Sequence, residues 1–203
     1  MKIKFDQILV EPMASSKDYY DSKTFRVYDG GTLAGTYTSN IDYLYQGTGN
    51  LNGNTVSLWD VKYFNQSRPV NSYQTREIIM RFAIDDWSDQ TLRSYAPTTT
   101  PKNATLSVSL TGFVPTFTWE ISTESSSIAD SSNLSGKYVR WTFKPVLGTA
   151  TAKSTYTMEP GARITNQFGQ VGFKATHNID YYRNLNGQVI SNTGPITKYS
   201  NDR

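Results

Sequence analysis

The chain has 203 residues, of which 37% are hydrophobic, 18% charged and 13% aromatic, and its formal net charge is +3. This length allows a buried core, and so many aromatic residues with so few charges exclude an intrinsically disordered protein. Basic residues are scattered among acidic ones, which predicts no nucleic-acid binding through a direct basic patch. The chain lacks cysteine, which excludes disulfide bonds and cysteine-based zinc sites.

The N-terminal stretch MKIKFDQILVEPM alternates apolar residues with Lys and Asp, which is not the pattern of a secretory signal peptide. No stretch approaches the roughly 18 consecutive apolar residues of a transmembrane segment. We therefore expect the protein in a virion, outside the cell or at the cell surface, without a signal peptide in this chain.

Alternation of apolar and polar residues dominates the chain and predicts β-strands. Prolines and glycines are spread along the whole length, which leaves little room for long helices. The stretch REIIMRFAI at 76–84 is more continuously apolar and predicts a central strand covered on both faces. The other predicted strands are FRVYD (25–29), VSLWDVKYF (56–64), KYVRWTFKP (137–145), TAKSTYTME (151–159) and QVGFKAT (170–176).

The tetrapeptides NIDY and NLNG occur twice in the same order, starting at Asn40 and again at Asn178. The dipeptides at 52–53 and 186–187 are both Asn-Gly, a strong signal for a type I′ turn, which needs positive φ at both central residues. We therefore predict two hairpins of related design. Too little chain follows Asn178 for the duplication of a whole domain.

One short helix is predicted at 89–95, within DDWSDQTLRSYA. Ser88 is a favourable N-cap, and Asp89 lies in the first turn, where a carboxylate suits the helix dipole. Trp87 and Leu92 occupy the two positions of a hydrophobic staple. The loop at 96–104 is a possible subdomain boundary, and otherwise we expect one β-sandwich domain over 1–203.

The most regular alternation lies in ATLSVSLTGFVPTFTWEIS, which predicts a hairpin over 105–122 with one apolar and one hydroxyl-bearing face. A pore-forming protein inserts strands of this kind, with an apolar lipid face and a polar lumen face. Each arm has about seven residues, fewer than the roughly 9–11 that span a bilayer. An ordinary half-buried hairpin has the same pattern, so the alternation favours that interpretation over a membrane-inserting hairpin.

The sequence offers no catalytic constellation, and we expect neither enzymatic activity nor a cofactor. His177 is the only histidine, and no nucleophile elbow or phosphate-binding glycine loop is present. A Ser–His–Asp triad through His177 is compatible with the sequence, because triad partners need not be close along the chain, but a lone histidine beside a turn is more often incidental. The acidic cluster Asp85, Asp86 and Asp89 is a weak calcium candidate, although helix capping also explains Asp89.

These patterns predict an all-β fold, namely a two-sheet antiparallel sandwich of jelly-roll or immunoglobulin-like type with one short helix near 89–95. The first functional hypothesis is a non-enzymatic structural protein, namely a virus or phage particle subunit (for example of the capsid) or another self-assembling surface protein, that forms homo-oligomers or contacts other particle subunits. The second is a lectin-like, carbohydrate-binding module, and the third is a pore-forming protein that uses hairpin 105–122. The candidate glycan-binding residues of the second are Tyr43, Tyr45, Trp87, Tyr181 and Tyr182.

Overall fold

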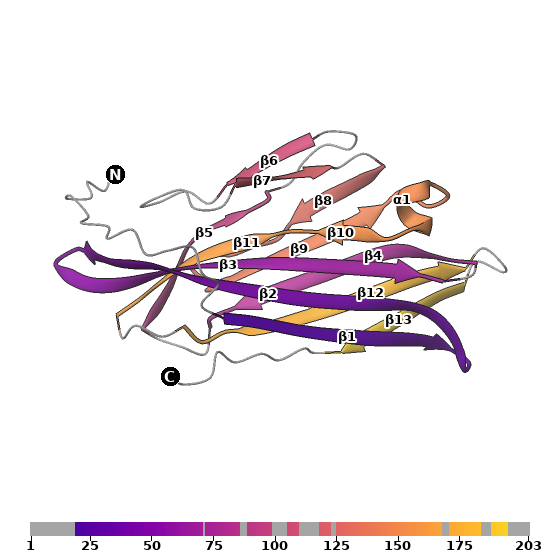
Figure 1. The fold of residues 1–203 in the computed structure, drawn as a ribbon, viewed down its shortest axis with the longest axis horizontal. Helices are drawn as coiled ribbons and strands as arrows, with labels where there is room; N and C mark the ends of the chain where they lie inside the picture. Colours follow the sequence, from indigo (N-terminus) through magenta and orange to yellow (C-terminus); the bar gives the residue numbers. More distant parts are fainter. Residues whose placement is uncertain are drawn as a thin grey trace.

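The computed structural model describes residues 19–70, 72–85, 89–98, 105–109, 118–122, 125–167, 171–183 and 188–194. Most of these residues lie in antiparallel strands, and the strands form two large sheets packed face to face (Figure 1). The predicted two-sheet antiparallel sandwich is confirmed.

The first sheet has the strand order β1–β2–β3–β11–β5, and β10 also pairs with β3. The bounds of its strands are β1 Tyr19–Asp29, β2 Thr32–Leu51, β3 Asn54–Pro69, β11 Gly161–Asn166, β5 Gln90–Ala96 and β10 Tyr156–Met158. The second sheet has the order β13–β12–β4–β9–β8. Its bounds are β13 Gln188–Gly194, β12 Lys174–Arg183, β4 Tyr73–Ala83, β9 Tyr138–Pro145 and β8 Ser126–Asp130.

The core lies between the two sheets because alternate residues of each strand point to the same face. In β9, the inward residues Val139, Trp141 and Phe143 are fully buried, as the alternation predicted. The Trp141 indole N–H donates to the carbonyl oxygen of Pro97 at 2.7 Å. Strand β4 lies between β12 and β9, so the predicted central position is confirmed, but Ile79 is only half-buried and the predicted burial of both faces is wrong.

The predicted helix at 89–95 is wrong, because these residues form strand β5. β5 pairs with β11, and Leu92 is buried opposite Ile164. The ladder hydrogen bonds and this burial outweigh the local capping signals, which act only on a free helix end. A four-residue helix, α1 (Ala150–Lys153), replaces the start of the predicted strand 151–159, and only Tyr156–Met158 of that stretch forms a strand. The Thr149 side chain caps the helix by accepting from the Ala152 N–H.

The two NIDY segments lie on facing strands of different sheets. Their apolar residues Ile41 and Tyr43 on β2, and Ile179 and Tyr181 on β12, are all buried. The β2–β3 turn has positive φ at Asn52 and Gly53 (51° and 84°), as a type I′ turn requires. β12 and β13 pair antiparallel as predicted, but the second Asn-Gly lies outside the described residues. The two copies of NIDY thus contribute buried side chains to the core, one copy from each sheet.

A buried ion pair fixes β11 against β3. Asp60 and Arg163 are opposite each other in the ladder, and both side chains are fully buried. The guanidinium donates through Nε to Oδ1 at 2.6 Å and through Nη2 to Oδ2 at 2.7 Å. Removing one partner of such a pair leaves an uncompensated charge and costs about 3–5 kcal/mol, so the pairing favours this register over its alternatives.

Gly35 is predicted to be intolerant of any side chain. A Cβ atom there would lie 2.5 Å from Cζ and 2.7 Å from Cε1 of the Tyr181 ring, which comes from the opposite sheet. Gly35→Ala should lower the free energy of unfolding by about 1–3 kcal/mol, measured by urea denaturation. Adding Tyr181→Leu should make the double variant more stable than the sum of the two single effects. Strict additivity would contradict this contact.

Candidate functional site

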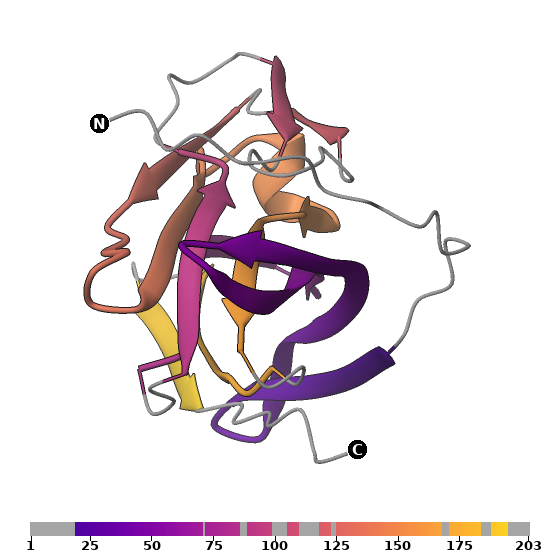
Figure 2. The same cartoon turned by 90° about the vertical axis from the view of Figure 1, so that its left-hand side faces the viewer.

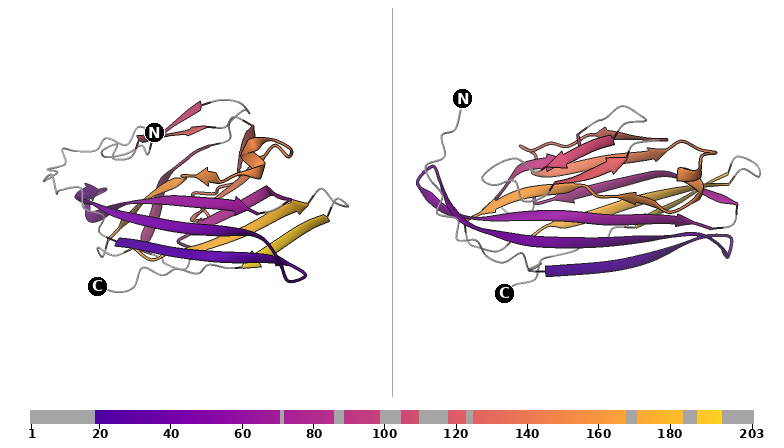
Figure 3. Two further views of the ribbon diagram at one scale, coloured as in Figure 1. Left: turned by 45° about the vertical axis from the view of Figure 1, so that its right-hand side comes forward. Right: turned by 45° about the horizontal axis from the view of Figure 1, so that its top comes forward.

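A separate hairpin lies outside the sandwich. Strands β6 (Thr105–Ser109) and β7 (Thr118–Ser122) form a two-stranded sheet, and neither pairs with another strand of the described residues. Figure 1 shows them beyond β5 and β8, and the views in Figure 2 and Figure 3 also place them outside both layers. The strand pairing predicted within 105–122 is confirmed.

The pairing register of this hairpin sorts its residues by polarity. The two apolar pairs are Leu106 with Ile121 and Val108 with Trp119, and the three polar pairs are Thr105 with Ser122, Ser107 with Glu120 and Ser109 with Thr118. Directly opposite residues of an antiparallel pair share one face, and successive pairs alternate between faces. The register therefore pairs apolar residues with apolar ones and polar residues with polar ones.

A second candidate is a buried polar group that we call the histidine cluster, formed by Tyr37 and Ser39 of β2 and His177 of β12. The Tyr37 hydroxyl lies 2.7 Å from His177 Nδ1, and the Ser39 hydroxyl lies 3.5 Å from Nε2. All three residues are buried. The cluster joins the two sheets across the core, over sequence separations of 140 and 138 residues.

The electrostatics of the histidine cluster favour a neutral imidazole. Burial lowers the pKa of His177 to about 3, because the charged ring would lose its hydration. Burial also raises the pKa of Tyr37 well above its usual value. Both ring nitrogens face hydroxyl groups, whereas the histidine of a catalytic triad needs a carboxylate on one of them. This arrangement connects sheets and does not form the triad considered for His177.

The structure does not bring the four candidate glycan-binding residues that it describes together as an exposed platform. Tyr43 and Tyr181 are core residues, and a buried ring cannot stack on a sugar. Tyr45 and Tyr182 are half-buried on different sheets, and Tyr45 packs against Trp59 with ring centroids 5.1 Å apart. Trp87 lies outside the described residues.

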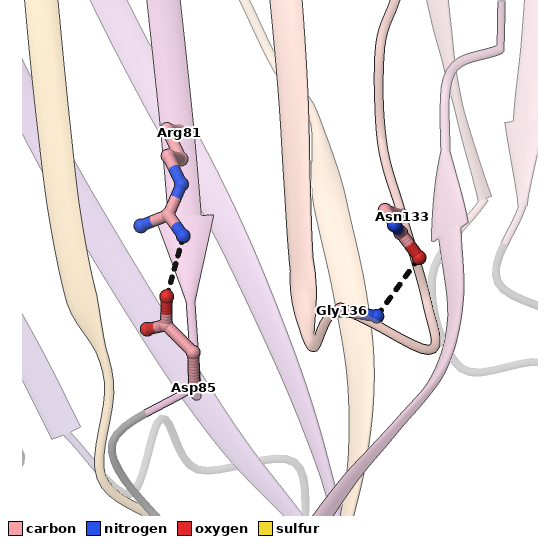
Figure 4. Close-up of polar contacts among 4 residues, drawn as sticks. All are labelled: Arg81, Asp85, Asn133 and Gly136. Carbon is pink, nitrogen blue, oxygen red and sulfur yellow. Dashed lines mark hydrogen bonds and ion pairs between the residues drawn. The ribbon is translucent and has the colours of Figure 1, made fainter.

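The structure describes two of the three candidate calcium residues, Asp85 and Asp89. Asp85 accepts a hydrogen bond from Arg81 Nη2 at 2.6 Å, as Figure 4 shows. Asp89 is half-buried, and Asp86 lies outside the described residues. No group of three or more metal-binding side chains occurs within the described ranges.

Figure 4 also shows how the loop between β8 and β9 is closed. The side-chain oxygen of Asn133 accepts from the Gly136 backbone N–H at 2.8 Å. The Ser135 hydroxyl donates to the same oxygen at 2.8 Å. This amide thus acts as a turn-forming group.

Sequence reasoning missed the Asp60–Arg163 pair and the partners of His177. A signal for Asp60 was present, since it is a lone charge within the apolar stretch VSLWDV. A signal for His177 was the alternation of KATHNIDYY, which places it on the same face as Ile179 and Tyr181. Neither signal identifies the partner on the other strand.

Comparisons with known proteins show a weak likeness in fold. No protein-family model and no curated protein sequence matches the chain. Among solved structures it is similar to a pore-forming protein, with TM-score 0.45 and 8% identity over 90% of this chain and 88% of that chain. It is also similar to Clostridium perfringens delta-toxin, with TM-score 0.44 and 8% identity over 89% and 87% of the two chains. Likeness at this level carries no argument about function.

Among the described residues, no helix has the length and apolar character needed to cross a membrane.

The depressed pKa of His177 predicts acid sensitivity. Its folded-state pKa of about 3 lies below the ordinary 6.5, so the unfolded chain binds the proton first as the pH falls. Protonation of His177 in the unfolded chain should lower the free energy of unfolding by about 1.4 kcal/mol per pH unit as the pH drops from about 6.5 towards 3. The control is His177→Gln, which keeps hydrogen-bonding groups but does not titrate. Denaturation of both chains across this window should give a shallower slope for the variant, and parallel slopes would contradict the assignment.

Proposed function

We propose that this chain is a pore-forming protein that assembles into a ring and inserts the β6–β7 hairpin into a lipid bilayer. One observation carries the proposal. The hairpin pairs with no other described strand, and its register places apolar residues opposite apolar ones and hydroxyls opposite hydroxyls or Glu120. The proposal does not draw on the weak overall likeness to solved structures. The capsid-subunit and glycan-binding hypotheses have no comparable support in the described residues.

The separate pairing matters for the energy of insertion. A strand inside a large sheet can leave only by breaking its ladder hydrogen bonds, and each broken bond leaves polar groups to be satisfied again. β6 and β7 share a ladder only with each other among the described strands. They can therefore move as one unit and keep that ladder.

Insertion requires the hairpin to lengthen. Strands β6 and β7 have five residues each, whereas a tilted strand that crosses a bilayer has about 9–11. The proposal therefore requires flanking residues of the chain to join the ladder in the membrane.

A single hairpin cannot span a membrane alone, because its two outer edges would expose unpaired N–H and C=O groups to lipid. Side-by-side pairing of hairpins from several copies satisfies these edges when the ring closes. The partner that this chemistry requires is a second copy of the same chain. The hydroxyl-bearing face then lines a water-filled lumen, and the apolar face contacts lipid.

Leakage of dye-filled liposomes tests the proposal with two neighbouring substitutions. Val108→Asp places a charge on the proposed lipid face, where it costs several kcal/mol, and should reduce leakage at least 100-fold. The matched control Ser107→Asp places the same charge on the proposed lumen face and should keep leakage within a few-fold of the unmodified chain. Both variants should retain the circular dichroism spectrum of the unmodified chain.

Absence of leakage by the unmodified chain at every lipid composition and pH tested would overturn the proposal. Equal loss of leakage in both aspartate variants would show that the alternation does not define a lipid face.

The position of Glu120 predicts the ion selectivity of the pore. It lies opposite Ser107 on the polar face, so each copy contributes one carboxylate to a ring in the lumen. Such rings favour cations. In planar bilayers under a KCl gradient, the reversal potential should indicate cation preference, and Glu120→Gln should move it towards zero while channels still form. An unchanged reversal potential would show that Glu120 does not line the lumen.

A further inference from the structure

Three polar atoms of β3 are buried without a protein partner. They are the Tyr63 hydroxyl and both side-chain atoms of Asn65, the amide oxygen and the amide nitrogen. Tyr63 is 1% exposed and Asn65 is 0% exposed. The two residues are two positions apart on one strand, so they share the face that points into the core.

These atoms belong to the surroundings of the histidine cluster. Ser39 is the ladder partner of Asn65, and its hydroxyl lies at the limit of hydrogen bonding from His177 Nε2, at 3.5 Å. The Tyr63 ring packs edge-on against the His177 ring, with centroids 6.4 Å apart. β2, β3 and β12 therefore bring an amide, three hydroxyls and a neutral imidazole to one place between the sheets.

Leaving such groups unpaired is costly, since each buried polar group without a hydrogen bond destabilises the fold appreciably. An amide oxygen needs a donor and an amide NH₂ needs an acceptor, so the missing partner must offer both. A metal cation accepts no hydrogen bond and would leave the NH₂ unpaired. An apolar guest would satisfy neither atom. Water donates and accepts, and buried waters typically make about three such bonds.

We propose that ordered water is bound between the sheets at Asn65, Tyr63 and Ser39, beside His177. This internal hydration site completes the hydrogen bonds of β3 in the way that direct contacts complete those of Tyr181, whose hydroxyl accepts from Ser67 and donates to the Thr36 carbonyl. The bound water links the first sheet to the histidine cluster. This site is independent of the pore proposed above.

Water-¹⁷O magnetic relaxation dispersion tests this site in the full chain, because it registers water held longer than the tumbling time and ignores hydroxyl protons. The unmodified protein should show a dispersion amplitude that Asn65→Leu, of similar shape but without the amide, reduces by at least one long-lived water. The control Thr38→Val removes an exposed hydroxyl on the outer face of β2 and should leave the amplitude unchanged. Equal amplitudes in the unmodified chain and Asn65→Leu would overturn the proposal.

A crystal structure of the unmodified chain tests the proposed water site even if the Asn65→Leu variant does not fold. The expected result is water density within about 2.6–3.2 Å of the Asn65 side chain. Direct pairing of the Asn65 amide with protein groups, or a cation surrounded only by oxygen atoms, would overturn the proposal.

Discussion

Burial of one face of each sheet against the other is the interaction on which the rest of this structure depends. Alternation along β2, β9 and β12 sends Tyr37, Trp141 and Tyr181 into the same layer, where all three are fully buried. The close approach of Gly35 to the Tyr181 ring shows how tightly the sheets meet. A two-stranded sheet must also bury its apolar face, but its area is too small to form a hydrophobic core alone. The β6–β7 hairpin has the alternation of the other strands without a place in either sheet, and this mismatch leads to the pore proposal.

Polar groups inside the sandwich follow a second rule, that every buried donor and acceptor needs a partner. The Asp60 carboxylate and two of the Arg163 nitrogens, Nε and Nη2, meet this requirement in a bidentate ion pair. The Tyr181 hydroxyl meets it with Ser67 and the Thr36 carbonyl. The histidine cluster meets it with neutral groups, and burial lowers the pKa of His177, so the imidazole stays neutral in the fold. These contacts contribute specificity of register more than net stability, because desolvation offsets much of their attraction.

The sequence alone supports those features that depend on neighbouring residues. Period-two alternation predicts strand β9 and the pairing of β6 with β7, and the dipeptide Asn52–Gly53 predicts the turn between β2 and β3. The helix prediction failed because the local signals around Ser88 carry no information about β11, a partner some seventy residues away. His177 was recognised only as a lone histidine, since its contacts lie 140 and 138 residues away. Contacts of this range arise from topology, which alternation does not encode.

The most direct test of the central claim is a site-by-site measurement of the environment of the hairpin. The chain has no cysteine, so single cysteines can be placed in turn along β6 and β7 and labelled with a polarity-sensitive fluorophore. On addition of liposomes, the account predicts a large rise in emission at 106, 108, 119 and 121 and little change at the alternate positions. Uniform emission along both strands, or emission unchanged by lipid, would contradict it.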